Sequence, residues 1–174
     1  MEPEIHRQTP ESQANRTPEA LARRYGEVIA RIDLLLDGET DWIAAMATVV
    51  CELHGAFDRY HWTGFYRRDA DDTLVIGPYQ GGHGCLRIAW GRGVCGTAAA
   101  SGETQRVDDV REFPGHIACS STTLSEIVVP VKTRDGRVVA VLDVDSDFPA
   151  AFGDVDRAAL EQLCNELGAR FGGV

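Results

Sequence analysis

The sequence predicts an α+β domain with a central, mostly antiparallel sheet of five to six strands, helices packed on one face and a ligand pocket on the other. Apolar residues recur at helical spacing near both ends of the chain, whereas the middle alternates with the period of two that is typical of strands. The 174 residues and a hydrophobic content of 44% fit a single domain with one core. We expect this domain to span residues 17–174, after a disordered tail over residues 1–16 that is poor in apolar side chains.

Helix signals come first. Thr17, followed by a proline, is typical of the residue that caps a helix, and the first helix is expected to follow it. Thr40 is expected to cap a second, apolar helix over residues 42–53, which Gly55 would end. A short helix is expected to begin near Val94, within a glycine-rich segment whose close loops are of the kind that often line sites.

The other segments of the chain are predicted to form a long loop, a closing helix and the strands of the sheet. Segment 108–123 shows no periodicity and is longer than an ordinary connection, so it is predicted to be a functional loop. An amphipathic helix over residues 154–171 is expected to close the domain. Residues 60–66 alternate with a period of two and are predicted to be a strand. Four further segments, bounded by turns or loops, are also predicted to be strands: residues 74–77, 105–107, 125–131 and 137–145.

The charge balance excludes several classes of function. Lys and Arg total 17 against 27 Asp and Glu, a net charge of −10, which argues against a nucleic-acid or anionic membrane surface and favours a cationic or zwitterionic small ligand. No apolar run is long enough to cross a membrane, and the N-terminus lacks the features of a signal peptide. Five cysteines, an odd number spread along the chain, favour a reducing cytoplasmic location over a secreted disulfide framework.

The hairpin formed by the last two predicted strands brings three carboxylates together. With a four-residue turn over residues 133–136, Glu126 would lie opposite Asp143, and Asp145 would share their face. One interpretation is a solvated end of the hairpin with ordinary surface acids. The other is a functional cluster, in which crowding raises at least one pKa so that a proton is retained for acid catalysis while the remaining charge binds an ammonium group.

Trp62 and Tyr66 share one face of the first predicted strand, with Gly64 between them leaving room for a close approach. Ordinary core packing explains such a pair. The alternative is an aromatic wall for a small ligand, with the tyrosine hydroxyl as a polar group.

The cysteines divide by context. Cys51 and Cys164 lie in apolar helical patterns and are expected to be inert core thiols. Cys85, Cys95 and Cys119 lie in glycine-rich or irregular segments and are the candidates for redox chemistry through a sulfenic acid and a disulfide. No metal site is expected, because there is no C-x-x-C pair and no histidine at ligand-like spacing.

Several motifs together resemble the free methionine-R-sulfoxide reductase family, which is built on a GAF domain. The resemblance runs from about Trp42 to Phe171 and rests on HWTGFY, GPYQGGHGCLRI, GRGVCGTAAASGETQ, VREFPGHIACSS, SEIVVPV and AVLDVDS. It implies that residues 17–174 form a GAF domain and that the protein reduces free L-methionine-R-sulfoxide in the cytoplasm. It further implies thioredoxin as reductant, no bound cofactor and a homodimer.

The resemblance also assigns roles by motif. Cys119 would be the nucleophile that becomes a sulfenic acid, Cys85 the main resolving thiol and Cys95 a third cysteine that supports recycling. Trp62 would hold the methyl group of the substrate. The residues that would bind and protonate the rest of it are Tyr66, Glu126, Asp143 and Asp145.

Two other classes of function stay open at this point. A GAF module without catalytic activity would bind a small cytosolic ligand and act through a partner, although such modules usually accompany an output domain, and the last predicted helix reaches the end of the sequence. A reductase acting on methionine sulfoxide in peptides would be expected to show a different fold and motif set. Loss of free thiols on adding free methionine sulfoxide would indicate a reductase, whereas binding without thiol loss would indicate a sensor.

Overall fold

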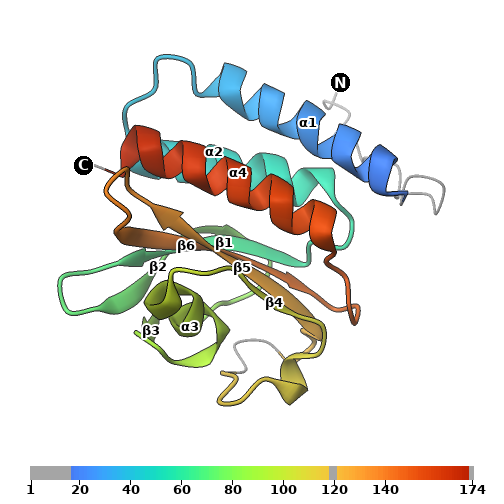
Figure 1. The fold of residues 1–174 in the computed structure, drawn as a ribbon, viewed down its shortest axis with the longest axis vertical. Helices are drawn as coiled ribbons and strands as arrows, with labels where there is room; N and C mark the ends of the chain where they lie inside the picture. The colour runs from blue at the N-terminus through green and yellow to red at the C-terminus, as the bar shows by residue number, and fades with distance from the viewer. Residues whose placement is uncertain (1–16, 118–120, 173–174) are drawn as a thin grey trace, which may run out of the picture.

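The computed structural model describes residues 17–117 and 121–172. The predicted tail, residues 1–16, and Cys119 lie outside these ranges. The described residues form one antiparallel sheet of six strands in the spatial order β3-β2-β1-β6-β5-β4 (Figure 1). The strands are β1 (Trp62–Arg68), β2 (Thr73–Gln80), β3 (Arg87–Ala89), β4 (Gln105–Val107), β5 (Ser125–Lys132) and β6 (Val138–Ser146).

Four α-helices flank this sheet, and the predicted α+β class is confirmed. Helices α2 (Trp42–Ala56) and α4 (Asp154–Phe171) cover one face, called here the helical face, and α1 (Pro18–Leu35) packs on their outer side. The short α3 (Gly93–Ser101) lies on the opposite face, called here the site face (Figure 1). A single 3₁₀ turn, η2 (Val110–Glu112), lies within the predicted functional loop.

The helix ends follow local capping chemistry. The Thr17 hydroxyl accepts a hydrogen bond from the Ala20 amide, as predicted for the start of α1. The helix α2 begins at Trp42 as predicted, but the predicted cap is wrong, because Asp41 and not Thr40 caps it, through its carboxylate and the Ala44 amide at 2.7 Å. The helix also continues past Gly55 to Ala56, which is buried against the core, so packing outweighs the helix-ending tendency of glycine.

The sheet contains one strand that the sequence pattern does not show. The three residues of β3, within the glycine-rich segment, pair with β2, where Leu74 lies opposite Ile88. Three residues are too few to display a period of two. This strand leads directly into α3 and thereby holds the helix against the site face.

The hairpin of β5 and β6 has a different register from the predicted one. Glu126 pairs with Asp145, and Asp143 pairs with Val128, so the prediction that Glu126 opposes Asp143 is wrong. The Thr133 amide donates to the Arg137 carbonyl, which makes the loop one residue shorter than expected. A bulge after Val131 adds a second shift of one residue. A total shift of two residues keeps every side chain on its predicted face.

The two faces of the sheet bury different side chains. The helical face holds a large aliphatic and aromatic core that includes Phe65, Leu142 and Leu160. The site face holds a smaller cluster that includes Trp62, Tyr66 and Cys95. Gly168 of α4 lies so close to β5 that a Cβ there would come 1.9 Å from the Lys132 carbonyl oxygen, so only glycine allows this approach of helix and sheet.

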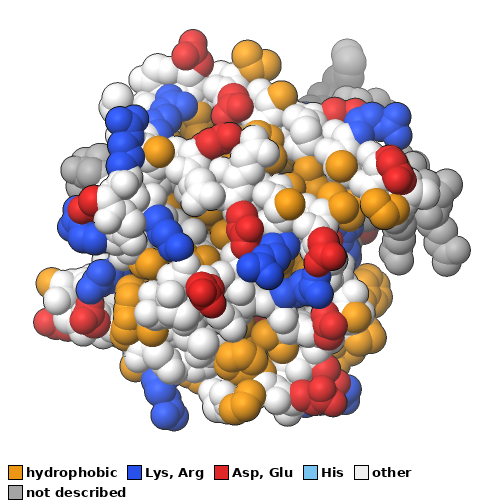
Figure 2. All heavy atoms as spheres, viewed as in Figure 1, with side chains coloured by type: hydrophobic (Ala, Val, Ile, Leu, Met, Phe, Trp, Pro, Cys, Tyr) orange, Lys and Arg blue, Asp and Glu red, His pale blue; other side chains and the backbone are white. Residues whose placement is uncertain are grey.

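On the molecular surface shown in Figure 2, acidic and basic side chains are interspersed. This view therefore shows no continuous basic surface of the kind that binds nucleic acid. Among the residues that the structure describes, no helix combines the length and the apolar character that crossing a bilayer requires.

Candidate active site

The three predicted carboxylates lie together on the site face. Glu126 comes from β5, whereas Asp143 and Asp145 come from the adjacent β6. Glu126 and Asp143 are only 6% and 5% exposed, and Asp145 is partly buried. The interpretation as solvated surface acids is therefore wrong for the first two. Outside the undescribed segments, no ion pair of the chain includes any of the three.

Burial and mutual repulsion keep protons on this carboxyl cluster. Burial, together with the charges of Asp143 and Asp145, raises the pKa of Glu126 well above its usual range. Burial raises the pKa of Asp143 to about 7. Burial also raises the pKa of Asp145, with a further contribution from the charge of Asp143. At neutral pH the cluster therefore retains carboxylic acid protons that can be donated to a ligand.

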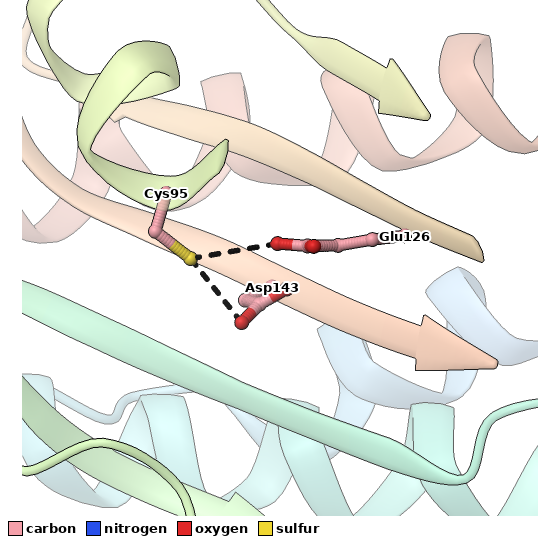
Figure 3. Close-up of side chains that lie close together, drawn as sticks. All are labelled: Cys95, Glu126 and Asp143. Carbon is pink, nitrogen blue, oxygen red and sulfur yellow. Dashed lines mark hydrogen bonds between the residues drawn. The ribbon is translucent and has the colours of Figure 1, made fainter. Parts of the chain in front are cut away.

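Cys95 completes the cluster from α3 (Figure 3). Its Sγ lies 3.2 Å from Asp143 Oδ2, to which it donates, and 3.9 Å from Glu126 Oε1. Burial and the charges of Asp143 and Glu126 raise the pKa of the Cys95 thiol. The thiolate is the nucleophilic form of cysteine, so in this arrangement Cys95 acts as a hydrogen-bond donor to the carboxylates.

A small cavity of about 30 Å³ opens beside these groups. This volume holds about two water-sized groups. Its walls include the three carboxyl side chains, Cys95, the first residues of α3 and part of the predicted functional loop, namely Ile88, Arg92, Gly93, Val94, Cys95, His116, Ile117, Thr123, Glu126, Asp143 and Asp145. Partial burial lowers the pKa of His116, so this imidazole is neutral near pH 7.

The aromatic pair lies next to the cluster but does not line this cavity. Trp62 and Tyr66 stack with ring centroids 5.8 Å apart, and both are buried. The space above Gly64 is taken by the Trp62 ring itself, because a Cβ there would lie 2.5 Å from that ring. The chain just before Cys85 covers both rings, since a Cβ at Gly84 would lie 2.9 Å from Trp62 and 3.0 Å from the Tyr66 hydroxyl. The residues flanking Cys85 are therefore in contact with the predicted aromatic wall.

The cysteines differ in state. Cys85 is disulfide-bonded, whereas Cys51, Cys95 and Cys164 are free. Cys164 is buried as predicted, but the prediction of a core position for Cys51 is wrong, because its side chain points away from the core side of α2 and is exposed. Cys119 lies outside the described residues, and its predicted role as nucleophile stays a prediction.

The sequence reasoning missed the contact between Cys95 and the carboxylates. Cys95 is 31 residues from Glu126 and 48 from Asp143, so no short motif joins them. The available signal was that GRGVCG opens a helix, which fixes the direction of the cysteine only when the position of the helix on the sheet is known. The thiol of Cys95 and the carboxyl groups of Glu126 and Asp143 could also hold a metal ion. Their ligand atoms all lie within 4.8 Å of one another, and no other such group occurs among the described residues.

Comparisons with known proteins agree with this fold. A family model described as a GAF domain matches residues 39–170. The chain is 42% identical over 143 residues to the free methionine-R-sulfoxide reductase of Escherichia coli, covering 82% of this chain and 86% of that protein. It is 42% identical over 135 residues to the yeast protein of the same name, covering 74% and 75%.

A solved structure shows the same relationship. The free methionine-R-sulfoxide reductase of Neisseria meningitidis, determined in complex with its substrate, is 46% identical with a TM-score of 0.83, covering 87% of this chain and 90% of that one. A six-stranded antiparallel sheet with its site opposite the long helices, together with the family match, makes this protein a member of the GAF-domain family. Within that family it belongs to the free methionine-R-sulfoxide reductases, which are oxidoreductases.

Proposed function

We propose that the protein reduces free L-methionine-R-sulfoxide to L-methionine by thiol chemistry. The observation that carries the proposal is the cluster of Glu126, Asp143 and Asp145, which are drawn together at one cavity with no ion pair recorded for them within the described chain. Such a cluster is unfavourable for folding unless a ligand makes use of it. Relatives at 42% identity carry the name of this activity.

The substrate is a zwitterion, and the site offers a partner for each of its charges. Its ammonium group is matched by the carboxyl cluster. Its carboxylate is matched by the N-terminus of α3, where Arg92 and the first amides of the helix line the same cavity. A methionine sulfoxide within a peptide lacks a free ammonium group and would leave the buried acids unpaired, which explains selectivity for the free amino acid.

Reduction also requires a proton, because the sulfoxide oxygen is a poor leaving group from sulfur unless it is protonated. Glu126, with Asp145 beside it, is the donor, since the raised pKa of each keeps it protonated near neutral pH. Trp62 and Tyr66 hold the methyl group and the body of the substrate. They are next to the cluster on the same face, and Tyr66 stays un-ionised because burial and the neighbouring carboxylates raise its pKa.

The redox step assigns the cysteines in sequence. The Cys119 thiolate attacks the sulfoxide sulfur, a proton from the acid reaches the oxygen, and methionine leaves while Cys119 becomes a sulfenic acid. The Cys85 thiol then condenses with the sulfenic acid, releasing water and forming a disulfide that a thioredoxin dithiol reduces. The disulfide-bonded state of Cys85 supports its role as resolving thiol. Cys95 supports the recycling of this disulfide once its thiol has lost its proton and is a thiolate.

A cytoplasmic location and a homodimer complete the proposal. Three free thiols fit a reducing compartment that would recycle the Cys85 disulfide. Exposed apolar side chains at the corner between α1 and α2 support an interface between two copies, since Leu34 is 79% exposed and Leu35 53%. Light scattering should give a molecular mass of twice that of the chain, and Leu34→Glu should reduce this mass to that of a single chain.

The central experiment follows NADPH consumption with thioredoxin and thioredoxin reductase. Three substrates are compared: free L-methionine-R-sulfoxide, its S epimer, and an N-acetylated, C-amidated analogue. Activity should be confined to the free R epimer, absent in Cys119→Ser and normal in Cys51→Ser, a matched change at an exposed thiol away from the site.

The same assay distinguishes the alternative. No turnover of any of the three substrates by a folded, fully reduced protein would overturn the proposal. Binding of free methionine sulfoxide without loss of thiols would then identify the protein as a GAF sensor module.

A further inference from the structure

The site face holds a set of atoms that suits a metal ion as well as an amino acid. Cys95 Sγ, a Glu126 carboxylate oxygen and an Asp143 carboxylate oxygen converge from α3, β5 and β6 (Figure 3). All three side chains are buried, and their ligand atoms lie within 4.8 Å of one another. Because they come from three separate elements of a rigid sheet and helix, their arrangement is present before any ligand arrives.

A second observation points to a cation at this place. Asp143 Oδ1 is buried and has no hydrogen-bond partner, although the side chain as a whole is only 5% exposed. A buried carboxylate oxygen without a partner is unfavourable, because it has lost its hydration and gained no hydrogen bond in exchange. Asp143 also lines the cavity, so a cation there would satisfy the oxygen that the protein leaves unpaired.

The spacing matches tetrahedral zinc. Zn–S bonds of about 2.3 Å and Zn–O bonds of about 2.1 Å at a tetrahedral angle separate the sulfur and oxygen ligands by about 3.6 Å. The observed distances from Cys95 Sγ are 3.2 Å to Asp143 and 3.9 Å to Glu126, on either side of that value. Small rotations of the two carboxyl groups would equalise them.

We propose that Cys95, Glu126 and Asp143 form a binding site for a thiophilic divalent cation such as Zn²⁺. The fourth position of the tetrahedron opens to the cavity, whose volume of about 30 Å³ accommodates a water molecule as fourth ligand. On binding, the Cys95 S–H bond breaks and the sulfur coordinates the metal, while Glu126 loses its carboxylic acid proton and coordinates through an oxygen. Both protons leave to solvent, with no change of oxidation state.

The metal would be an inhibitor and not a resident cofactor. It occupies the carboxylates to which the substrate ammonium group is assigned, and this consequence, unlike the site itself, rests on the proposed function. Zinc should therefore raise the KM for free methionine-R-sulfoxide without changing kcat. The absence of a short metal-binding motif does not count against such a site, because its ligands are 31 and 48 residues apart in sequence.

The test measures metal binding directly, on the full chain with the Cys85 disulfide intact so that this cysteine cannot serve as ligand. After treatment with EDTA, the protein is titrated with Co²⁺, which reports a thiolate ligand through a near-ultraviolet sulfur-to-metal absorption band. One equivalent should develop the band, and Zn²⁺ should abolish it. The same titration in a Cys85→Ser, Cys119→Ser double variant, which lacks both thiols, should give the same result.

Variants identify the ligands. Cys95→Ala and Cys95→Ser should each abolish the sulfur-to-cobalt band, whereas Cys51→Ser should retain it. Asp143→Asn should weaken Zn²⁺ binding by at least about 10-fold, because even the loss of a group that only hydrogen-bonds to a metal ligand has an effect of this size. Using both Cys95 variants, each checked for folding by circular dichroism, guards against a misfolded one.

Two results would overturn the proposed site: no band at millimolar Co²⁺, or a band that survives in a folded Cys95 variant. The inhibition assay is separate. A competitive effect of Zn²⁺ on turnover that Asp143→Asn weakens would support the overlap with the substrate. If the protein proves inactive on every sulfoxide, the cobalt titration still decides the metal site.

Discussion

The two faces of the sheet bury charge in opposite ways. On the helical face the buried carboxylate of Asp156 pairs with Arg59 and accepts a hydrogen bond from Tyr25 at 2.5 Å. On the site face Glu126, Asp143 and Asp145 face one another with no ion pair recorded within the described chain. The comparison shows that one sheet carries both a compensated core, which holds the fold together, and an uncompensated cluster, which is held in place for a ligand.

The largest expected effect is on the site face. Glu126→Gln keeps the size of the side chain and removes the acidic proton, so kcat/KM for free methionine-R-sulfoxide should fall about 10²- to 10⁴-fold, the range for loss of a general acid. The free energy of unfolding should not fall, since one of three crowded acids is removed. Thioredoxin-coupled kinetics and urea denaturation measure the two quantities.

The matched control for this change is Glu166→Gln on α4, where the glutamate is exposed and accepts a hydrogen bond from Gln162. It should leave both quantities unchanged. Full activity in Glu126→Gln would show that the cluster does not supply the proton.

A substitution on the helical face should have the reverse pattern. Leu160 is fully buried between α4 and the sheet, and Leu160→Ala should lower the free energy of unfolding by about 2–5 kcal/mol. Activity per folded molecule, measured well below the midpoint of thermal unfolding, should stay within a factor of about two, because no atom of Leu160 reaches the site. A loss of activity without a loss of stability would contradict the separation of the two faces.

The carboxyl cluster should also set the pH dependence of stability. The pKa of Asp143 is raised to about 7, so the folded state binds more protons than the unfolded state between an ordinary carboxyl pKa near 4 and pH 7. The cluster's contribution to stability is therefore fully present near pH 4 and is lost as the pH rises to 7. Urea denaturation in the presence of EDTA should show this decline, and Asp143→Asn should flatten it.

Asp109→Asn is the control for this experiment. Hydrogen bonds from Arg111 lower the pKa of the partly buried Asp109 to about 2, so this carboxylate is ionised in the folded state throughout the same window. Above about pH 5 this aspartate is ionised in the unfolded state as well, so the pH slope of the variant between pH 5 and pH 7 should equal that of the wild type. A wild-type stability that is independent of pH, or a slope that survives Asp143→Asn, would refute the role assigned to the cluster.

The same contrast explains which features could be predicted from the sequence. The convergence of Glu126, Asp143 and Asp145 follows from the alternation of side chains along strands, and it survives a register that is wrong by two residues. The register itself could not be predicted, because the shorter loop at Thr133 and the bulge after Val131 depend on packing and on hydrogen bonds closed in three dimensions. The helical periods of α1 and α4 were strong enough to locate both helices.

The features that could not be predicted depend on contacts between distant elements. Cys95 meets the carboxylates only because β3 and α3 bring the glycine-rich segment back onto the sheet. The sequence predicts room for a ligand above Gly64, but the Trp62 ring fills this space, since the rotamer of a side chain depends on its neighbours in the fold. The predicted tail and the role of Cys119 fall outside the described residues.

The smallest expected effect comes from a titratable group on the helical face, and it has the opposite sign to that of the carboxyl cluster. His54 of α2 is half-buried, and its Nδ1 lies 3.2 Å from Thr63 Oγ1. Burial, with a further contribution from the charge of His61, lowers the pKa of His54 below its ordinary value of 6.5. The folded state therefore binds fewer protons than the unfolded state just below pH 6.5, and stability is lost as the pH falls through that region.

Between pH 4 and pH 6.5 the two faces consequently oppose each other: acidification strengthens the fold through the site face and weakens it through His54. His54→Gln removes only the second contribution, so the gain in stability on acidification should be steeper in this variant than in the wild type. Urea midpoints at pH 7, 6 and 5 measure the difference, and His83→Gln, at an exposed position of the loop after β2, provides the control. A smaller gain in stability on acidification in His54→Gln than in the wild type would contradict this prediction. It would mean that the fold stabilises the charged form of the His54 imidazole and not the neutral form.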